Sequence, residues 1–422
     1  IRAAVNAISL TVSHLRGSYA LAILFADIPD ALFAVRRDSP LIVGLGEGEN
    51  YIASDIPAIL GHTRRYYLLE ENEIAIVRRD SVEVVNEELT PIEKPVMTAD
   101  WNVDAAEKGG YPHFMLKEIH EQPSTLNATI QPRLAAGKTE VLREELGNTA
   151  DVERLLIIGC GSATHAGMVG KIAIEKLARI PVETHIASEF RYSDPIFRAG
   201  DVAVIISQSG ETADTLAALR LAKANNIPVW AIVNVVGSSI AREADSVMYT
   251  WAGPEIAVAT TKAYSTQLAV IYLLAMHLAD VRGLLSASRR QELIEQLLAL
   301  PDQIERVLSD KERVQWYANK MAACKDVFFI GRGLDYAISM EGSLKLKEIS
   351  YIHSEAFAAG EMKHGPISLV ENGTLVVGIL TQPDLFEKSV SNMVEVKSRG
   401  AFLMGLTTYG NYSIEDTAGF TV

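Results

Sequence analysis

The sequence has 422 residues, of which 48% are hydrophobic and 22% are charged, as is typical of a globular protein with two or three domains. Its net charge of −14, with no compensating basic tract, argues against binding to nucleic acid or to an anionic membrane surface. The longest apolar run, Leu268–Ala279, contains His277 and is too short to span a bilayer. Cys160 and Cys324 lie far apart without CxxC spacing, which indicates a reducing cytoplasm and no zinc site.

Residues 1–95 have a β-rich pattern in which short apolar runs alternate with Asp, Gly and Pro turns. The clearest runs are Tyr19–Phe25, Leu32–Val35, Leu41–Leu45 and Ile74–Val77. Two prolines in Thr90–Pro95 indicate a linker there, and we place the linker proper at 96–110. Because Ile1 begins in the middle of a pattern, without a start signal, we interpret the sequence as a fragment.

From about residue 100 onward, strands alternate with helices, as in a parallel α/β sheet. Three strand-and-turn segments recur in the same order at an offset of about 172 to 174 residues. Leu155–Gly161 matches Val327–Gly333, Ala203–Ser209 matches Val377–Pro383, and Val229–Val235 matches Phe402–Thr408. The repeat predicts two related doubly wound domains, each with a Gly-rich turn after its first strand.

The loop at Ser207–Thr212 has an unusual composition. Before it, Val202–Ile206 is apolar and largely β-branched, which predicts a strand buried on both faces. After it, Leu216–Lys223 is rich in strong helix formers. Backbone N–H groups, a helix dipole and several hydroxyls at such a loop suit a phosphate or other anion. The simpler interpretation is a helix N-cap, but three hydroxyl residues exceed what a cap requires.

The first Gly-rich turn is expected to lie beside this loop, because ligands of doubly wound sheets bind at the carboxyl ends of the strands. Gly159–Ser162 and Ser207–Thr212 would then form one polar pocket. The second half has Thr381–Asp384 in place of Ser207–Gly210 and lacks these hydroxyls, so only the first half is predicted to bind an anion. Neither turn has a complete GxGxxG fingerprint, which weighs against a dinucleotide; in the first turn, Thr164 holds the position of the third glycine.

The densest group of chemically active residues lies in the second half. Glu341, Lys345 and Glu348 are spaced at i, i+4 and i+7, so they share one face of a helix. An ordinary solvated salt bridge would have the same spacing. Downstream, Phe357–Pro366 places His364 in a loop rich in Gly and Pro. A carboxylate, an ammonium and a histidine together supply an acid/base set.

Two further polar clusters have simpler interpretations. His353, Glu355 and His364 are residues of metal-ligand type, but no known ligand spacing fits them, so we predict no metal. Thr260–Thr266 precedes the apolar helix expected at 267–279 and is interpreted, taken alone, as a helix cap.

Long motifs in this sequence resemble the glutamine–fructose-6-phosphate aminotransferases, also called glucosamine-6-phosphate synthases. These motifs are Ser207–Thr215, Asn234–Ser239, Glu341–His353 and Gly360–Pro366. Tyr111–Pro123 resembles the family's entry into its isomerase part. Arg37–Leu41 and Tyr51–Asp55 resemble the end of its glutaminase domain, which has an N-terminal-nucleophile hydrolase fold.

The resemblance implies an α/β protein with two tandem sugar-isomerase (SIS) domains, preceded by the β-rich end of a glutaminase domain. We expect the glutaminase part over 1–95, the linker over 96–110, the first SIS domain over 111–285 and a truncated second one over 286–422. The family releases ammonia from glutamine, binds fructose 6-phosphate, opens its ring, aminates C2 and isomerises the product to glucosamine 6-phosphate. No cofactor is implied.

The resemblance also implies roles for individual residues. The phosphate cradle would consist of Ser162, Ser207, Gln208, Ser209 and Thr212. Val258 and Thr260 match positions that contact the sugar. Glu348 matches the carboxylate that moves a proton between C1 and C2, a role that suits a carboxylate whose pKa is raised by burial. Lys345 would stabilise the developing oxyanion. His364 matches the ring-opening histidine, which in this family comes from the other subunit of a homodimer.

Three departures from the family pattern shape these expectations. Ala163 stands where the family usually has a serine, so we expect weaker or differently shaped phosphate binding. The family's N-terminal catalytic cysteine and glutamine-binding residues have no counterpart here. The chain stops at Val422, before the tail that carries the family's Schiff-base lysine. We therefore expect this stretch of sequence, by itself, to be inactive as a synthase.

Two other functions remain as alternatives. The first is a phosphosugar isomerase or deglycase without glutaminase coupling, against which residues 1–95 argue. The second is a non-catalytic sugar-phosphate sensor, which would need the Ser207–Thr212 loop but not Glu348, Lys345 and His364 together.

Overall fold

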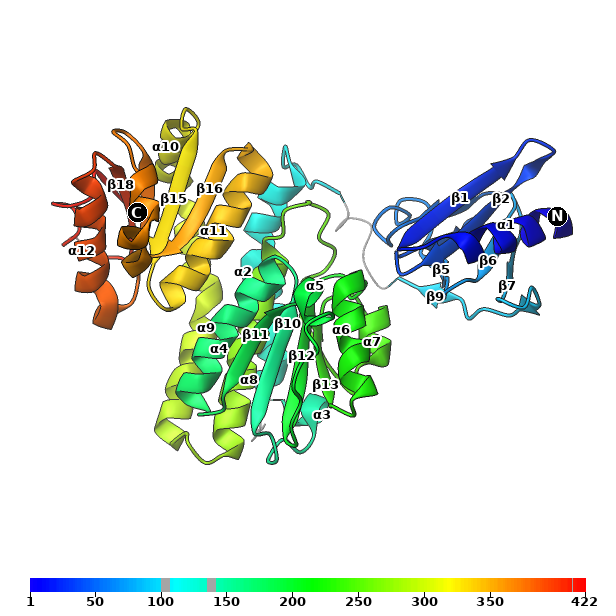
Figure 1. Cartoon of the computed structure of the whole chain (residues 1–422), viewed down its shortest axis with the longest axis horizontal. Coiled ribbons are helices and arrows are strands. Elements are labelled where there is room, and N and C mark those ends of the chain that lie inside the picture. The colour runs from blue at the N-terminus through cyan, green and yellow to red at the C-terminus, as the bar shows by residue number, and fades with distance from the viewer. Residues whose placement is uncertain (100–106, 135–141, 412) are drawn as a thin grey trace. The chain divides into compact units, whose positions relative to one another are not determined.

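The computed structural model describes residues 1–99, 107–134, 142–411 and 413–422. The chain divides into two compact units, one consisting mainly of residues 1–117 and the other mainly of residues 118–422. The first unit is β-rich and the second is α/β (Figure 1). Within the described ranges, none of the helices combines the length and the apolar character needed to cross a lipid bilayer.

The first unit contains two antiparallel sheets. In spatial order, one sheet consists of β1 (Tyr19–Phe25), β2 (Ile28–Arg37), β6 (Ile74–Val77), β7 (Val82–Val85) and β8 (Pro91–Ile92). The other consists of β4 (Asn50–Ala53), β3 (Ile42–Leu45), β5 (Arg65–Leu68) and β9 (Met97–Thr98). Side chains alternate across β2, so Phe33 and Val35 join one core and Ala34 joins another. Helix α1 (Arg2–His14) buries Val5 and Ile8 in the core that contains Phe33.

Two features of this unit differ from the sequence-based expectation. Helix α1 lies in a region expected to be β-rich, and its buried residues Ala4, Val5, Ile8 and Val12 have helical spacing. The proline-containing segment 90–95, interpreted as a linker, contributes the edge strand β8, a position that proline tolerates in a sheet. Residues 100–106 of the linker expected at 96–110 lie outside the described residues.

The second unit contains two parallel sheets of the same topology (Figure 1). The first has the spatial order β11 (Val182–Ile186), β10 (Arg154–Gly159), β12 (Asp201–Ser207), β13 (Val229–Val233) and β14 (Ser246–Tyr249). The second has the order β16 (His353–Ala358), β15 (Asp326–Gly331), β17 (Leu375–Leu380), β18 (Phe402–Thr407) and β19 (Phe420–Thr421). The prediction of two related parallel α/β domains is therefore confirmed.

Helices cover both sheets. Those associated with the first are α2 (Phe114–Leu134), α3 (Arg143–Leu146), α4 (Ser162–Leu177), α5 (Ala187–Phe190), α6 (Ala213–Ala224), α7 (Ser239–Glu243) and α8 (Lys262–Val281). They are followed by α9 (Ala287–Ser309), α10 (Lys311–Met321), α11 (Leu334–Ser350) and α12 (Phe386–Lys397), with short 3₁₀ helices η2 (Ala359–His364), η3 (Pro366–Leu369) and η4 (Pro383–Leu385). Gly170 lets α4 approach α8, since a Cβ there would lie 2.9 Å from Ile271.

Helix α9 packs on the core of the first sheet. Leu297 is buried in that core, and Leu293, Leu300 and Ile304 pack against it. The boundary expected at 285/286 lies just before α9, whose apolar side chains pack in the core of the first domain.

Candidate functional site

The carboxyl ends of β10 and β12 place the two predicted turns at one edge of the first sheet. These strands are parallel neighbours, with Leu155 opposite Val202 and Ile158 opposite Ile205. Both are buried along their whole length, as expected for strands covered on two faces. The Gly159–Ser162 turn and the loop that follows Ser207 were predicted to lie side by side. The strand order confirms that they follow neighbouring parallel strands.

The loop after β12 is held by two hydrogen bonds of the Gly210 backbone. The Gly210 N–H donates to Ser207 Oγ at 3.0 Å, and the Ile240 N–H donates to the Gly210 carbonyl. Gly210 has φ +69°, and a Cβ at this position would lie 2.0 Å from Ser238 Oγ. The site therefore requires glycine, because both the backbone angle and the available space exclude a side chain. The loop is followed directly by α6, so its N–H groups lie at a helix N-terminus.

The corresponding edge of the second sheet already contains a carboxylate. Asp335, near the start of α11, is 2% exposed. Its Oδ2 accepts from the Thr381 backbone N–H at 3.0 Å, and its Oδ1 accepts from the Thr381 hydroxyl at 2.5 Å. Donors at the end of β17 are therefore satisfied from within the chain. That only the first half binds an external anion stays a prediction.

The predicted acid/base row forms on α11. Lys345 Nζ lies 2.5 Å from Glu348 Oε2 and 3.5 Å from Glu341 Oε1, so the three side chains share one helix face, as their spacing predicted. The Glu341 side chain is 8% exposed, whereas that of Glu348 is 32% exposed. The row thus runs from a buried carboxylate to one that a solvent-borne ligand can reach.

Glu341 connects this row to the first sheet. Its Oε1 accepts a hydrogen bond from Ser162 Oγ at 2.7 Å, and its Oε2 lies 2.7 Å from His165 Nδ1. Burial raises the pKa of Tyr264, on α8, and the charge of Glu341 raises it further. A carboxylate of the second domain is therefore held by two side chains of α4 in the first domain. Ser162, expected to contact phosphate, makes this bond to Glu341.

His165 was not singled out from the sequence. The pattern that could have identified it is its i, i+3 spacing from Ser162 in the first turn of α4, directly after a Gly-rich turn. The partner of His165 lies 176 positions away, so only the arrangement of the two domains brings them together.

The other predicted residues occupy loops and short helices. Gln208 and Ser209 lie in the loop after β12, and Thr212 immediately precedes α6. Val258 is fully exposed, and Thr260 is half-buried shortly before α8. His364 ends η2 and is exposed.

His364 stands apart from the acid/base row. Among the described residues, no hydrogen bond or ion pair joins it to Glu341, Lys345 or Glu348 of its own chain. The structure thus brings Ser162 and the α11 row together, but not His364.

The cluster at Thr260–Thr266 is not a simple helix cap. Thr261 occupies the N-cap position of α8, yet its side chain makes no capping hydrogen bond. Instead, Lys262 Nζ pairs with Glu121 Oε2 at 2.7 Å, and Ser265 Oγ donates to Gln122 Oε1 at 2.5 Å. These side chains fasten the start of α8 to α2, because a buried ammonium needs a charged partner.

The alternative metal ligands do not converge. His353 Nδ1 pairs with Asp326 Oδ1 at 2.8 Å on the surface. In the part of the chain that the structure describes, no three His, Cys, Asp or Glu side chains are grouped so as to hold a metal ion. Cys160 and Cys324 are not joined by a disulfide.

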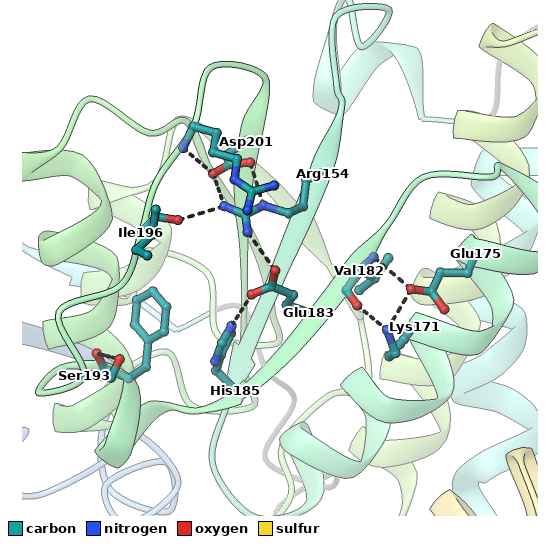
Figure 2. Close-up of polar contacts among 11 residues, drawn as sticks. Arg154, Lys171, Glu175, Val182, Glu183, His185, Ser193, Ile196 and Asp201 are labelled. Atoms are coloured by element: carbon teal, nitrogen blue, oxygen red, sulfur yellow. Dashed lines mark hydrogen bonds and ion pairs between the residues drawn. The ribbon is translucent and has the colours of Figure 1, made fainter.

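The opposite edge of the first sheet is fastened by Arg154 (Figure 2). This buried guanidinium donates to both oxygens of Asp201, to Glu183 Oε1 and to the Ile196 carbonyl. Hydrogen bonds to Asp201 raise the pKa of Arg154. Burial by itself would raise the pKa of Asp201, but bonds from Arg154 and the Arg198 N–H outweigh it and lower that pKa. Neighbouring strands β10, β11 and β12 are therefore joined at their starts, away from the candidate site.

Comparisons with known proteins agree with this fold. The SIS domain family model matches residues 149–277 and 320–421. A glutamine–fructose-6-phosphate aminotransferase [isomerizing] of Clostridium tetani (strain Massachusetts / E88) is 53% identical over 97% of this chain and 68% of its own length. One from Methanosarcina acetivorans is 48% identical over 94% of this chain and 65% of its own length.

Solved structures give the same result. The C-terminal domain of glucosamine-fructose-6-phosphate aminotransferase from Francisella tularensis is 37% identical, with a TM-score of 0.71, and the match covers 75% of this chain and 90% of that one. A putative phosphosugar isomerase from Silicibacter pomeroyi is 26% identical, with a TM-score of 0.59, over 72% and 88% of the two chains. This chain belongs to the glutamine–fructose-6-phosphate aminotransferase family, and its second unit consists of two SIS domains.

Proposed function

We propose that this chain carries the sugar-binding and isomerising part of an enzyme that makes glucosamine 6-phosphate and glutamate from fructose 6-phosphate and glutamine. The observation that supports this most is the α11 row, in which Glu348 and Lys345 pair beside a carboxylate fastened to the Gly-rich turn of the first SIS domain. The row lies beside the edge at which ligands of such sheets bind.

In the proposed reaction the loop at Ser207–Thr212, here called the anion loop, binds the phosphate. Ser207, Gln208, Ser209 and Thr212 contribute donors at the N-terminus of α6, together with the backbone N–H of Ser162, whose hydroxyl donates to Glu341. Val258 and Thr260 contact the sugar. These contacts fix the carbon chain relative to α11, which lowers the entropic part of the barrier.

The α11 row then performs the proton transfer. After amination at C2, Glu348 takes a proton from C1 and returns it to C2, which converts the ketose imine into the aldose amine. The Lys345 ammonium stabilises the negative charge that develops on the sugar oxygen. Because Glu348 is 32% exposed, a bound sugar can reach its carboxylate.

We further propose that His364 opens the sugar ring in the active site of a second subunit. It is exposed and belongs to a short 3₁₀ helix, and its own chain's row lacks a polar contact with it among the described residues. The protein would then act as a homodimer with two shared sites. Two cysteines without a disulfide fit a reducing compartment, so we assign the protein to the cytoplasm.

Two variants of the complete gene product test these assignments. Glu348→Gln should lower turnover by about 100- to 10,000-fold while sugar-phosphate binding persists, because the amide keeps the shape but cannot accept a proton. Unchanged turnover would remove Glu348 from this role. Mixing inactive Glu348→Gln and His364→Ala subunits should restore activity, since a mixed dimer has one site with both residues intact. Absence of activity in a confirmed mixed dimer would place His364 in its own chain's site.

The second candidate is a phosphosugar isomerase that does not aminate. Its support is the resemblance in fold to the Silicibacter pomeroyi protein. Interconversion of fructose 6-phosphate and an aldose phosphate, without incorporation of nitrogen under any condition, would favour it.

A further inference from the structure

His165 makes a buried polar contact that the proposed reaction leaves without a role. It lies in the first turn of α4, and its Nδ1 lies 2.7 Å from Glu341 Oε2 on α11. Both side chains are largely buried, with 12% and 8% of their surfaces exposed. A carboxylate only accepts hydrogen bonds, so the proton of this contact is on Nδ1.

Glu341 in turn connects His165 to the reacting end of the row. Its other oxygen, Oε1, accepts from Ser162 Oγ at 2.7 Å and lies 3.5 Å from Lys345 Nζ. Lys345 pairs with Glu348 at 2.5 Å. A continuous chain of polar contacts therefore extends from the imidazole of one SIS domain to the exposed carboxylate of the other.

We propose that His165 is a positioning residue for the α11 row. Donors from His165 and Ser162 hold the two Glu341 oxygens, and the fixed carboxylate sets the place of the Lys345 ammonium. A lysine side chain has four rotatable bonds and loses up to about 2 kcal/mol of rotamer entropy when it is fixed. Without a fixed Glu341, the ammonium would follow the more exposed Glu348. The inference rests on the proposed function, because it assigns a role within that reaction.

The surroundings of His165 allow a chemical test. The residue lines a cavity of ≈ 340 Å³ together with Gly161, Leu344, Lys347 and Phe357. A substitution that removes the ring would enlarge this cavity, and a small heterocycle of the same shape can fill such a space. Free imidazole is therefore a suitable probe for a variant that lacks the side chain.

A matched pair of substitutions distinguishes the role of the ring nitrogen Nδ1 from that of Nε2. In His165→Asn the side-chain amide nitrogen takes the place of Nδ1 and keeps the donor to Glu341. In His165→Gln the amide nitrogen takes the place of Nε2 and the donor is displaced. We expect kcat for sugar-phosphate turnover to fall about 10- to 100-fold in His165→Gln and His165→Ala, as for other positioning residues, with little change in KM. His165→Asn should keep most of kcat, and imidazole should partly restore His165→Ala.

Defined outcomes would overturn the inference. Equal kcat in His165→Ala and the unchanged complete gene product, with Glu348→Gln inactive, would show that the row needs no support from His165 and would leave the proposed function intact. Parallel loss of kcat and of the melting temperature in all three variants, without rescue by Asn or imidazole, would assign His165 a purely structural role. If the unchanged protein converts no sugar phosphate, the proposed function fails and this inference fails with it.

Discussion

Ala163 and Asp335 occupy equivalent positions, the second residue of α4 and of α11, but only Asp335 carries an acceptor. Asp335 binds the N–H and hydroxyl of Thr381, the counterpart of Ser207 in the repeat. The second SIS domain thus contains its own anion at the edge where ligands of such sheets bind. The first domain has only a methyl group at this position, and we propose that a ligand supplies the anion there.

Ala163→Asp should introduce a competing carboxylate into the first domain. We expect the affinity for fructose 6-phosphate and for inorganic phosphate to fall at least about tenfold, because like charges brought together in a binding site repel. Ala163→Asn has the same size without the charge and serves as the control. Isothermal titration calorimetry on both variants measures the difference. Equal affinities for the Asp and Asn variants would locate the phosphate elsewhere.

Asp335→Ala should destabilise the second SIS domain. Removing this acceptor breaks both hydrogen bonds to Thr381, and because Thr381 is exposed to water the cost should be about 1 kcal/mol. Hydrogen exchange of the β15 and β17 amides reports the local free energy of opening. Asp384→Ala removes an exposed carboxylate three residues beyond Thr381 and is expected to change nothing. Identical exchange in both variants would show that the Asp335 contacts are not stabilising.

Gly210→Ala should distort the anion loop. The substitution forces a side chain into a backbone with φ +69° and into contact with Ser238 Oγ. Gly147→Ala is the matched control, because its φ is +65° but a Cβ there meets no atom within 4 Å. We expect Gly210→Ala to lower fructose 6-phosphate affinity and Gly147→Ala to retain it. If both variants keep the affinity of the unchanged protein, the loop does not take part in substrate binding.

The free energy of unfolding should decrease at low pH because of the carboxyl groups of Asp201 and Glu175. Bonds from Arg154 and the Arg198 N–H lower the pKa of Asp201 below its ordinary 3.8 despite burial. Likewise, Lys171 and the Val182 N–H outweigh burial at Glu175 and lower its pKa below 4.5 (Figure 2). A lowered folded-state pKa means that the unfolded chain binds more protons, so stability falls as acid is added.

This stabilisation is complete above the ordinary values and is lost as pH falls below about 4 through the lowered ones. Asp201→Asn should therefore be less stable at pH 7 and show a shallower loss between about pH 4 and pH 2. Asp302→Asn, at an exposed position of α9, should reproduce the steep profile of the unchanged chain. Denaturant unfolding at a series of pH values measures both. A steep profile in Asp201→Asn would assign the acid sensitivity to other groups.

Local patterns in the sequence predicted much of the fold and part of the candidate site. The uninterrupted apolar runs of β10 and β12 indicated strands buried on both faces, and their neighbouring positions follow from the topology of doubly wound sheets. The row on α11 followed from helical spacing alone, because residues at i, i+4 and i+7 share a face. These features could be predicted because each depends on residues close together in one helix or strand, or on a common sheet topology.

The other features could not be predicted, because they depend on contacts between residues that are far apart in the sequence. The contact between His165 and Glu341 joins two domains, and no local spacing predicts where a second sheet will lie. Assignment of α9 to the first domain depends on which core its apolar face covers. Helix α1 was missed because the short strands after it dominate the composition of residues 1–95, although Val5, Ile8 and Val12 have helical spacing.

The most direct test of the central proposal uses the complete gene product, shown by mass spectrometry to be intact. It is incubated with fructose 6-phosphate and glutamine labelled with ¹⁵N in its side-chain amide. We predict glucosamine 6-phosphate that carries ¹⁵N at C2, formed together with glutamate. Absence of labelled amino sugar from intact, folded protein would contradict the proposal, and isomerised sugar phosphate without nitrogen would leave the non-aminating isomerase in its place.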